Sequence, residues 1–266
     1  MMNFIILNII ASNAINGWKR PIYFTHPFGE LGFGGYLRKD GLAYRLVPVA
    51  VKTPERNWLT DQILSQTPIG GTSIRDNNSD SIYKNLMTHY EFGGAGRKGM
   101  YYDEENRRHL LSIRSIFGEA AGNLADKGRI EDAQRLLDKA EKGISTESLP
   151  YAMTSRYNSH NQTAMIYLEA CYKSGKTDLA EKVRVNLRKD LEDQKKYYDY
   201  IRTSRSDLFG HFERTEYPIN EILLQVLDEI EKKYAPHVVP KTTTETPAII
   251  TNPPKDSVGA DTGRDR

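Results

Sequence analysis

The chain has 266 residues, 38% of them hydrophobic, which is enough for one large domain or two small ones that fold without disulfides or metal. Lysine and arginine number 37 and aspartate and glutamate 35, so the net charge of +2 argues against a polyanion binder and gives no reason to expect nucleic acid as a partner. The single cysteine, Cys171, cannot form an internal disulfide or a zinc cluster, and its apolar neighbours favour a buried side chain over a reactive thiol.

The first residues, M-M-N-F-I-I-L-N-I-I-A, form an apolar run that is too short to span a bilayer. Lys19 and Arg20 follow the run, whereas a signal peptide carries its basic residues before it, so cleavage at Ala14 is the less favoured alternative. We expect a helix that is buried against the rest of the fold. Because this helix is apolar nearly all round, it needs cover on every side, which suggests that something upstream is missing.

Residues 17–50 carry strand signals in R-P-I-Y-F-T and in G-L-A-Y-R-L-V-P-V, with a glycine-rich loop between them, and predict two or three short strands. Asp40-Gly41 predicts a tight turn. The alternation of Leu42, Tyr44 and Leu46 predicts one face that packs against the N-terminal helix. We expect the charged side chains of this stretch, on Arg38, Lys39 and Arg45, to be solvated.

Residues 51–102 mix proline, glycine and polar runs, which indicates an irregular connecting region with a short helix at 81–89. From Asp103 the apolar spacing becomes helical, with helices over 110–127, over 178–200 and over 220–234. The tail, residues 236–266, is rich in proline, threonine and charge, and we expect it to be disordered.

Two segments share the small-residue pattern of a tetratricopeptide-type helical hairpin. Gly128 with Ala133 forms the first copy, and Gly175 with Ala180 forms the second, 47 positions later. The usual spacing is about 34, so an insertion or irregular joint is expected over 146–159. The predicted fold is α+β: an apolar helix with short strands over 1–50, the connecting region over 51–102, tetratricopeptide-like helices over 103–235, and the tail.

Three patterns suggest nucleotide or anion binding, and each has a structural explanation that we favour. The stretch 94–99, G-A-G-R-K-G, matches a dinucleotide fingerprint but lacks the strand before it and the helix after it. The stretch 174–177, S-G-K-T, lacks the first glycine of a phosphate loop and predicts an inter-helix turn. The stretch 103–108, D-E-E-N-R-R, suits a helix start with local charge pairing.

The histidines lack the spacing of a helical zinc site, and we expect them to be solvated or in the core. His211 with Glu213 and Glu216 forms the only local cluster of metal-ligand types, and we do not favour a metal there. The glycan acceptor patterns at 77–79 and 161–163, and Ser257 as an O-glycan acceptor, are short enough to occur by chance. The sequence therefore assigns no catalytic, cofactor-binding or metal-binding residue, and no cofactor.

The order of R-P-I-Y-F at 20–24, Y-L-R-K-D-G-L-A-Y-R-L-V-P-V at 36–49, D-E-E-N-R-R and the paired hairpins resembles a known family. It is similar, over residues 3–235, to the C-terminal soluble segment of bacterial multi-pass membrane proteins of unknown function that resemble protein O-mannosyltransferases, which are lipid-linked sugar transferases. In that family a membrane-embedded region precedes the helix and strands and carries the catalytic acid, so the resemblance transfers no catalytic residue to this chain.

Two functions follow as expectations. In the first, the chain is a non-catalytic accessory domain of a membrane glycosyltransferase-like protein, on the periplasmic face of the inner membrane, that binds an acceptor or partner protein. In the second, it is a free-standing tetratricopeptide-like adaptor. An autonomous enzyme is the least favoured. We expect a protein or peptide partner, with the membrane-embedded region of a parent protein as a further contact, and no nucleic acid.

Overall fold

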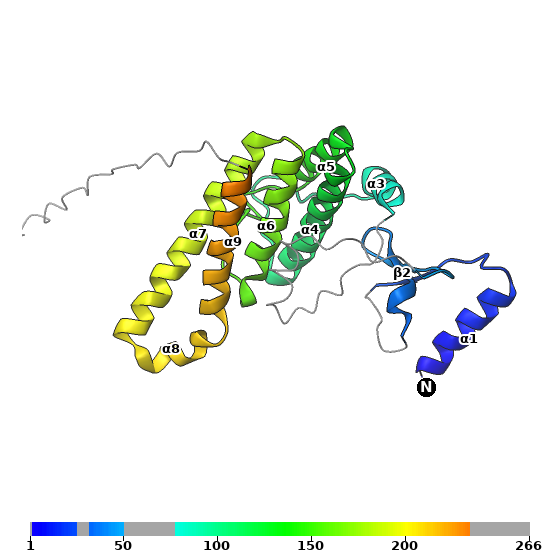
Figure 1. The fold of residues 1–266 in the computed structure, drawn as a ribbon, viewed down its shortest axis with the longest axis horizontal. Helices are drawn as coiled ribbons and strands as arrows, with labels where there is room; N and C mark the ends of the chain where they lie inside the picture. Colours follow the sequence, from blue (N-terminus) through cyan, green and yellow to red (C-terminus); the bar gives the residue numbers. More distant parts are fainter. Residues whose placement is uncertain (1, 26–31, 51–77, 235–266) are drawn as a thin grey trace, which may run out of the picture. The chain divides into compact units, whose positions relative to one another are not determined.

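The structure, a computed structural model, describes residues 2–25, 32–50 and 78–234, which all lie within one unit of the chain, Met1–Ala235. The fold is α+β and mainly helical, as predicted (Figure 1). Its elements in chain order are α1 (Met2–Ile15), β1 (Ile22–Phe24), η1 (Phe33–Tyr36), β2 (Leu37–Lys39), β3 (Tyr44–Leu46), α3 (Ser79–Thr88), α4 (Glu104–Asp126), α5 (Ile130–Gly143), η2 (Arg156–Asn158), α6 (Ser159–Lys173), α7 (Thr177–Ser204), α8 (Ser206–Glu213) and α9 (Glu216–Tyr234).

Some of the structural predictions concern residues that the structure does not describe. The first part of the connecting region, 51–77, and the tail, 236–266, lie outside the described residues, as does Ser257. The boundaries placed after residues 50 and 102 stay predictions.

The three strands form an antiparallel sheet in the order β1-β3-β2. The predicted turn at Asp40-Gly41 joins β2 to β3, with Gly41 at φ 117°, a conformation that other residues rarely adopt. A side chain at Gly41 would also meet the Tyr90 hydroxyl, whose oxygen lies 2.7 Å from the position of an added Cβ. Glycine is therefore required here both by the backbone and by the close approach of Tyr90.

The sheet is attached to the helices through polar contacts of this hairpin. Lys39 Nζ lies 2.6 Å from Oε2 of Glu119 on α4, and the backbone N–H of Leu42 donates to the Tyr90 hydroxyl at 2.6 Å. Asn85 of α3 donates to the carbonyl of Asp40 at 3.1 Å. The expectation that Lys39 is solvated is wrong, because its side chain is 9% exposed and paired with a carboxylate. Arg38 lies on the same strand and pairs with Asp40 at 3.0 Å.

The expectation that α1 is buried against the rest of the fold is also wrong. Phe4, Ile5, Leu7, Ile9 and Ile15 are all exposed, Phe4 by 75% and Ile15 by 86%. Among the described elements, none packs closely on α1, and Leu42, expected to face this helix, is exposed as well. The physical reason is that a sheet of three-residue strands offers too little apolar surface to cover this helix.

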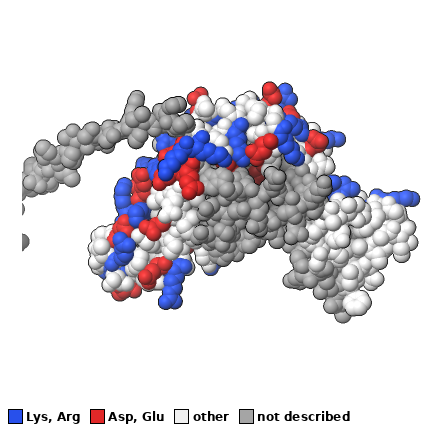
Figure 2. Space-filling view, in the orientation of Figure 1, with Lys and Arg blue, Asp and Glu red and all other residues white. Residues whose placement is uncertain are grey.

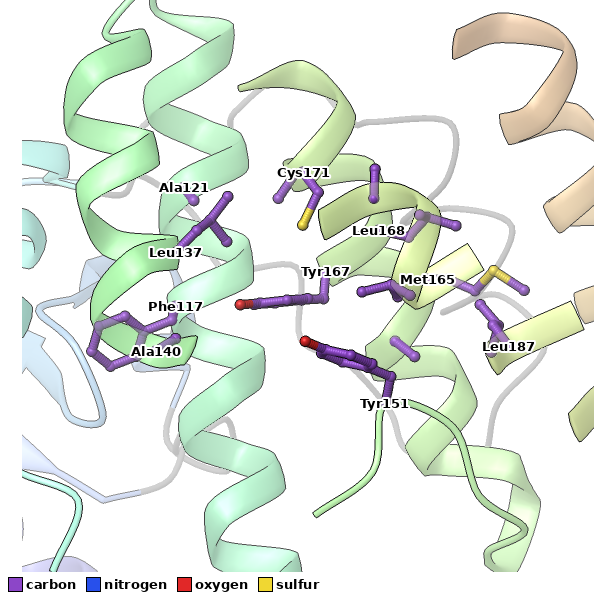
Figure 3. Packing of buried hydrophobic residues seen from close by; sticks show 14 of the residues in the cluster. Phe117, Ala121, Leu137, Ala140, Tyr151, Met165, Tyr167, Leu168, Cys171 and Leu187 are labelled. Carbon is purple, nitrogen blue, oxygen red and sulfur yellow. The ribbon is translucent and has the colours of Figure 1, made fainter. Parts of the chain in front are cut away.

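The helices from α4 onward form the predicted hairpins. The chain turns at Gly128 between α4 and α5 and at Gly175 between α6 and α7, with φ of 76° and 75°. Ala133 and Ala180 are completely buried, so neighbouring helices approach closely at both positions, as the pattern predicted. α4 packs extensively on α5 and α6, and α7 packs on α6, α8 and α9. The hydrophobic core runs through this array (Figure 3).

The helix boundaries follow from local chemistry. Asp103 caps α4, because its carboxylate accepts from the backbone N–H of Asn106 at 2.8 Å, and Glu105 pairs with Arg108 one turn later. This confirms the structural interpretation of D-E-E-N-R-R. The long helix predicted at 178–200 is α7, whereas α8 was not predicted from the sequence.

Candidate functional site

The nucleotide-like patterns occupy structural turns. Residues 94–99 form a loop that no strand precedes, and α4 begins only at Glu104. Within that loop an added Cβ at Gly96 would lie 2.7 Å from the carbonyl oxygen of Lys142, so glycine serves packing against the end of α5. Residues 174–177 connect α6 to α7, as predicted.

The other candidate residues can be followed only in part. Among the described residues, no group of three or more His, Cys, Asp or Glu side chains could hold a metal ion. The side chain of His211, like Asn77 of the first acceptor pattern, lies outside what the structure describes. Asn161 is completely buried, and its amide donates to Asn158 at 3.0 Å and to Asp190 at 2.8 Å, so its nitrogen is not available for a glycan in the folded chain.

Cys171 is completely buried, as predicted. Burial raises the pKa of its thiol, and the nearby Glu141 carboxylate raises it further, so the side chain stays a protonated thiol at neutral pH.

A buried polar cluster lies where α4, α5 and α6 meet the 144–158 joint. The hydroxyls of Tyr151 and Tyr167 both donate to the Glu141 carboxylate, the second at 2.8 Å, and they point to the same side in Figure 3. Burial raises the pKa of both tyrosines, with Glu141 as a further cause, so both remain donors. Tyr151, Tyr167 and Arg114 are at least 91% buried, so these three side chains pack inside the helical array.

Side chains of α4 and α6 donate hydrogen bonds to backbone carbonyls of this joint. Arg114 donates to the carbonyls of Leu149 and Pro150, at 2.7 and 2.9 Å, and His160 Nε2 also lies 2.9 Å from the Pro150 oxygen. Burial lowers the pKa of His160 to about 4, so the ring is neutral at physiological pH and Nε2 carries the proton that it donates.

Two successive residues of the joint, Tyr157 and Asn158, adopt left-handed backbone conformations with φ of 54° and 52°. Such conformations are costly for side chains other than glycine and persist where surrounding contacts fix them. The Asn158 amide exchanges hydrogen bonds with Gln194 at 2.9 and 3.2 Å, and the Tyr157 N–H donates to Glu216 at 3.0 Å. This network connects the joint to α7 through Gln194 and to α9 through Glu216.

An exposed aromatic surface lies where α8 joins the ends of α7 and α9 (Figure 1). We call it the aromatic tip. Its base contains Tyr198, Phe209 and Tyr217, with the Tyr217 ring centroid 6.2 Å from that of Tyr198 and 5.5 Å from that of Phe209, both in edge-to-face geometry. Its residues are Tyr197, Tyr198, Tyr200, Ile201, Leu208, Phe209, Phe212 and Tyr217.

Three members of the tip face solvent, since Tyr197 is 52%, Tyr200 62% and Leu208 46% exposed. Charged side chains surround them in opposite-sign pairs, and the space-filling view shows both signs of charge interspersed over the helices (Figure 2). These pairs are Lys196 with Asp193, Arg202 with Asp199, and Arg205 with Asp207, each at 3.0 Å. Arg202 and Lys195 also lie over the Tyr217 ring, at 5.5 and 5.3 Å from its centroid.

An aromatic centre with a neutral, ion-paired rim has the composition of a protein-binding surface, in which tyrosine and arginine are enriched. The sequence analysis missed it. The signal that could have found it is the tyrosine-dense run K-K-Y-Y-D-Y-I-R at 195–202, in which Tyr197 and Tyr200 lie three positions apart and so neighbour each other on a helix.

Comparison with known proteins relates the first part of the chain to a family model. Residues 1–64 match the family model described as TMEM260-associated domain 2. The match covers α1 and the sheet, and it associates this part of the chain with a family related to membrane proteins. No curated protein and no solved structure matches the chain. Within the described residues, no helix is long and apolar enough to cross a membrane.

Proposed function

We propose that the chain is a non-catalytic accessory domain of a membrane glycosyltransferase-like protein, and that it binds an acceptor or partner polypeptide through its helical hairpins. The observation that carries the binding function is the aromatic tip, where Tyr197, Tyr200 and Leu208 are exposed over a packed aromatic base. Rigid tyrosine side chains supply a large contact area at low entropic cost. The match over residues 1–64 supports the association with a membrane protein, whereas sugar transfer and the periplasmic face rest on the family resemblance.

The site chemistry supports a binding rather than a catalytic role. Glu141 accepts two tyrosine hydroxyls, His160 donates to a backbone carbonyl, and Asn158 is paired with Gln194, so each of these buried polar groups serves the fold. We therefore assign no catalytic residue and no cofactor, and we assign partner recognition to the tip.

Site-specific photocross-linking tests this assignment. A benzophenone amino acid replaces Tyr200 in the native chain, and the control carries it at Val185, which is exposed on the same helix α7. We expect a defined polypeptide adduct at Tyr200, none at Val185, and at least tenfold less adduct when Tyr197→Ala and Leu208→Ala are added. Equal labelling at both positions, or no adduct, would contradict the proposal.

The alternative is a free-standing adaptor that binds a protein partner and has no part in sugar transfer. It is favoured by one observation, that the family match ends at residue 64 and the hairpins lie outside it. Both candidates predict cross-linking at the tip. They differ in the mass of the native protein and in the effect of deleting the hairpins from a full-length relative, which impairs sugar transfer only under the first.

A further inference from the structure

The first helix, α1, presents apolar side chains to solvent around much of its circumference. At 3.6 residues per turn the exposed side chains of Phe4, Ile5, Leu7, Ile9 and Ile15 extend over roughly 200°. Within this arc the exposed side chains of Asn8 and Ser12 are polar and uncharged. On the remaining side Asn13 is buried, and Ile6 and Ile10 are half-buried. A surface helix typically packs on a protein through an apolar stripe of about 100° or somewhat more, so an arc of about 200° fits a surrounding apolar medium better than a single contact face.

The chain leaves α1 through a turn with defined geometry. Gly17 and Trp18 both have positive φ, of 70° and 57°, and the Trp18 N–H donates to the carbonyl of Asn13 at 2.8 Å. The Asn13 amide then brackets Arg20, donating to its carbonyl at 2.5 Å and accepting from its N–H at 3.2 Å. These contacts fix Trp18, Lys19 and Arg20 at the end of α1.

The charge of this part of the chain is confined to that end. The sequence of α1, MNFIILNIIASNAI, contains no charged residue, and Lys19 and Arg20 follow directly. On the face drawn in Figure 2, the part of the molecule that contains α1 and the sheet shows mostly uncharged residues, with basic groups at its edge. Tryptophan and basic side chains prefer the interface of a membrane, where the ring is partly apolar and the cations meet anionic headgroups.

We propose that α1 is a membrane anchor, which inserts into the hydrocarbon of an anionic bilayer with Trp18, Lys19 and Arg20 at the headgroups. The helix as described has 14 residues and is about 21 Å long, which is shorter than a hydrocarbon thickness of about 30 Å. The anchor holds the chain on the surface through its own residues, and this role does not depend on sugar transfer.

Vesicle binding by the purified full chain tests the anchor. Trp58→Phe leaves Trp18 as the only tryptophan, and the vesicles consist of phosphatidylcholine alone or with 30% phosphatidylserine. We expect co-sedimentation and a blue shift of Trp18 emission, stronger with phosphatidylserine. Ile5→Lys with Ile9→Lys should weaken binding at least tenfold, because lysine is costly inside hydrocarbon. Lys19→Gln and Arg20→Gln should each weaken binding to the anionic vesicles about fivefold.

The matched control is Met100→Lys with Val185→Lys, which changes two exposed apolar residues outside α1 and the aromatic tip and should leave vesicle binding unchanged. Far-ultraviolet circular dichroism verifies that each variant keeps its helices. The anchor is ruled out if the full chain with an unmodified α1 does not bind vesicles. It is also ruled out if the variant with Ile5→Lys and Ile9→Lys binds vesicles as tightly as that parent chain. A defined oligomer that the same two substitutions disperse, without vesicle binding, would instead show that a second copy of the chain covers α1.

Discussion

Lys39 Nζ lies 2.6 Å from the Oε2 atom of Glu119, a contact that joins β2 to α4 across 80 positions of the sequence. Burial alone would lower the pKa of Lys39, but the attraction and hydrogen bond of Glu119 raise it overall, so the amine stays charged. The hairpin of β2 and β3 is therefore attached to the helical array by a buried cation and its counterion.

We predict that removing the acid from this pair costs more than removing the base. Glu119→Gln leaves a buried ammonium without a counterion and should destabilise by about 2 to 3 kcal/mol. Lys39→Met should cost about 1 kcal/mol or less, because Glu119 is 31% exposed and can be solvated. Denaturant unfolding measures the two values, and hydrogen exchange at 37–46 locates the effect. Equal costs would contradict the role given to Lys39.

The buried His160 predicts a pH dependence of stability. Its pKa is about 4 in the folded chain and about 6.5 unfolded, so below pH 6.5 the unfolded state binds the proton that the folded state excludes. The contribution of His160 is present above pH 6.5 and is lost as the pH falls to 4, by roughly 3 kcal/mol. His160→Gln should remove this slope. An unchanged slope in the variant would mean that other groups cause it.

Two glycines on α4 should respond oppositely to alanine. An added Cβ at Gly118 would lie 3.1 Å from the Tyr167 ring and 3.3 Å from the Tyr167 Cα, so Gly118→Ala should cost about 1 to 3 kcal/mol by overpacking. At Gly122 the nearest atom is the Ala170 Cβ at 3.7 Å, and Gly122→Ala should stabilise by about 0.5 to 1 kcal/mol through helix propensity. Thermal unfolding compares them, and stabilisation by Gly118→Ala would contradict the close packing of α4 on α6.

Gly128, in the turn between α4 and α5, and Gly210, inside α8, allow the free-energy cost of a left-handed backbone to be measured without a steric clash. An added Cβ at Gly128 would meet nothing within 4 Å, yet its φ of 76° makes alanine unfavourable by about 1 kcal/mol. Gly210 also has open space but lies inside helix α8 without positive φ, so Gly210→Ala should stabilise by a similar amount. Denaturant midpoints measure both changes. If both substitutions stabilise, the left-handed turn does not determine the choice of glycine.

The hairpins were predictable because their signals are local. Gly128 and Gly175 mark left-handed turns, Ala133 and Ala180 mark close helix contacts, and Asp103 caps its own helix. The strands could likewise be placed from alternation and from the turn at Asp40-Gly41.

The features that could not be predicted from the sequence depend on contacts between residues that are far apart in the chain. Nothing near Lys39 in the sequence reveals Glu119, so its burial was missed. Apolar composition predicted that α1 is helical, but whether it is covered depends on what lies around it, and here it is exposed. The aromatic tip forms only when α8 brings Phe209 and Phe212 against the tyrosines of α7, so its parts are scattered in the sequence.

The central claim is that this chain acts as an accessory part of a membrane protein. The mass and fractionation of the native protein, detected with an antibody against residues 103–235, test it most directly. The account predicts a band far heavier than 30.3 kDa in the membrane pellet. A soluble band near 30.3 kDa would contradict it and would favour the free-standing adaptor.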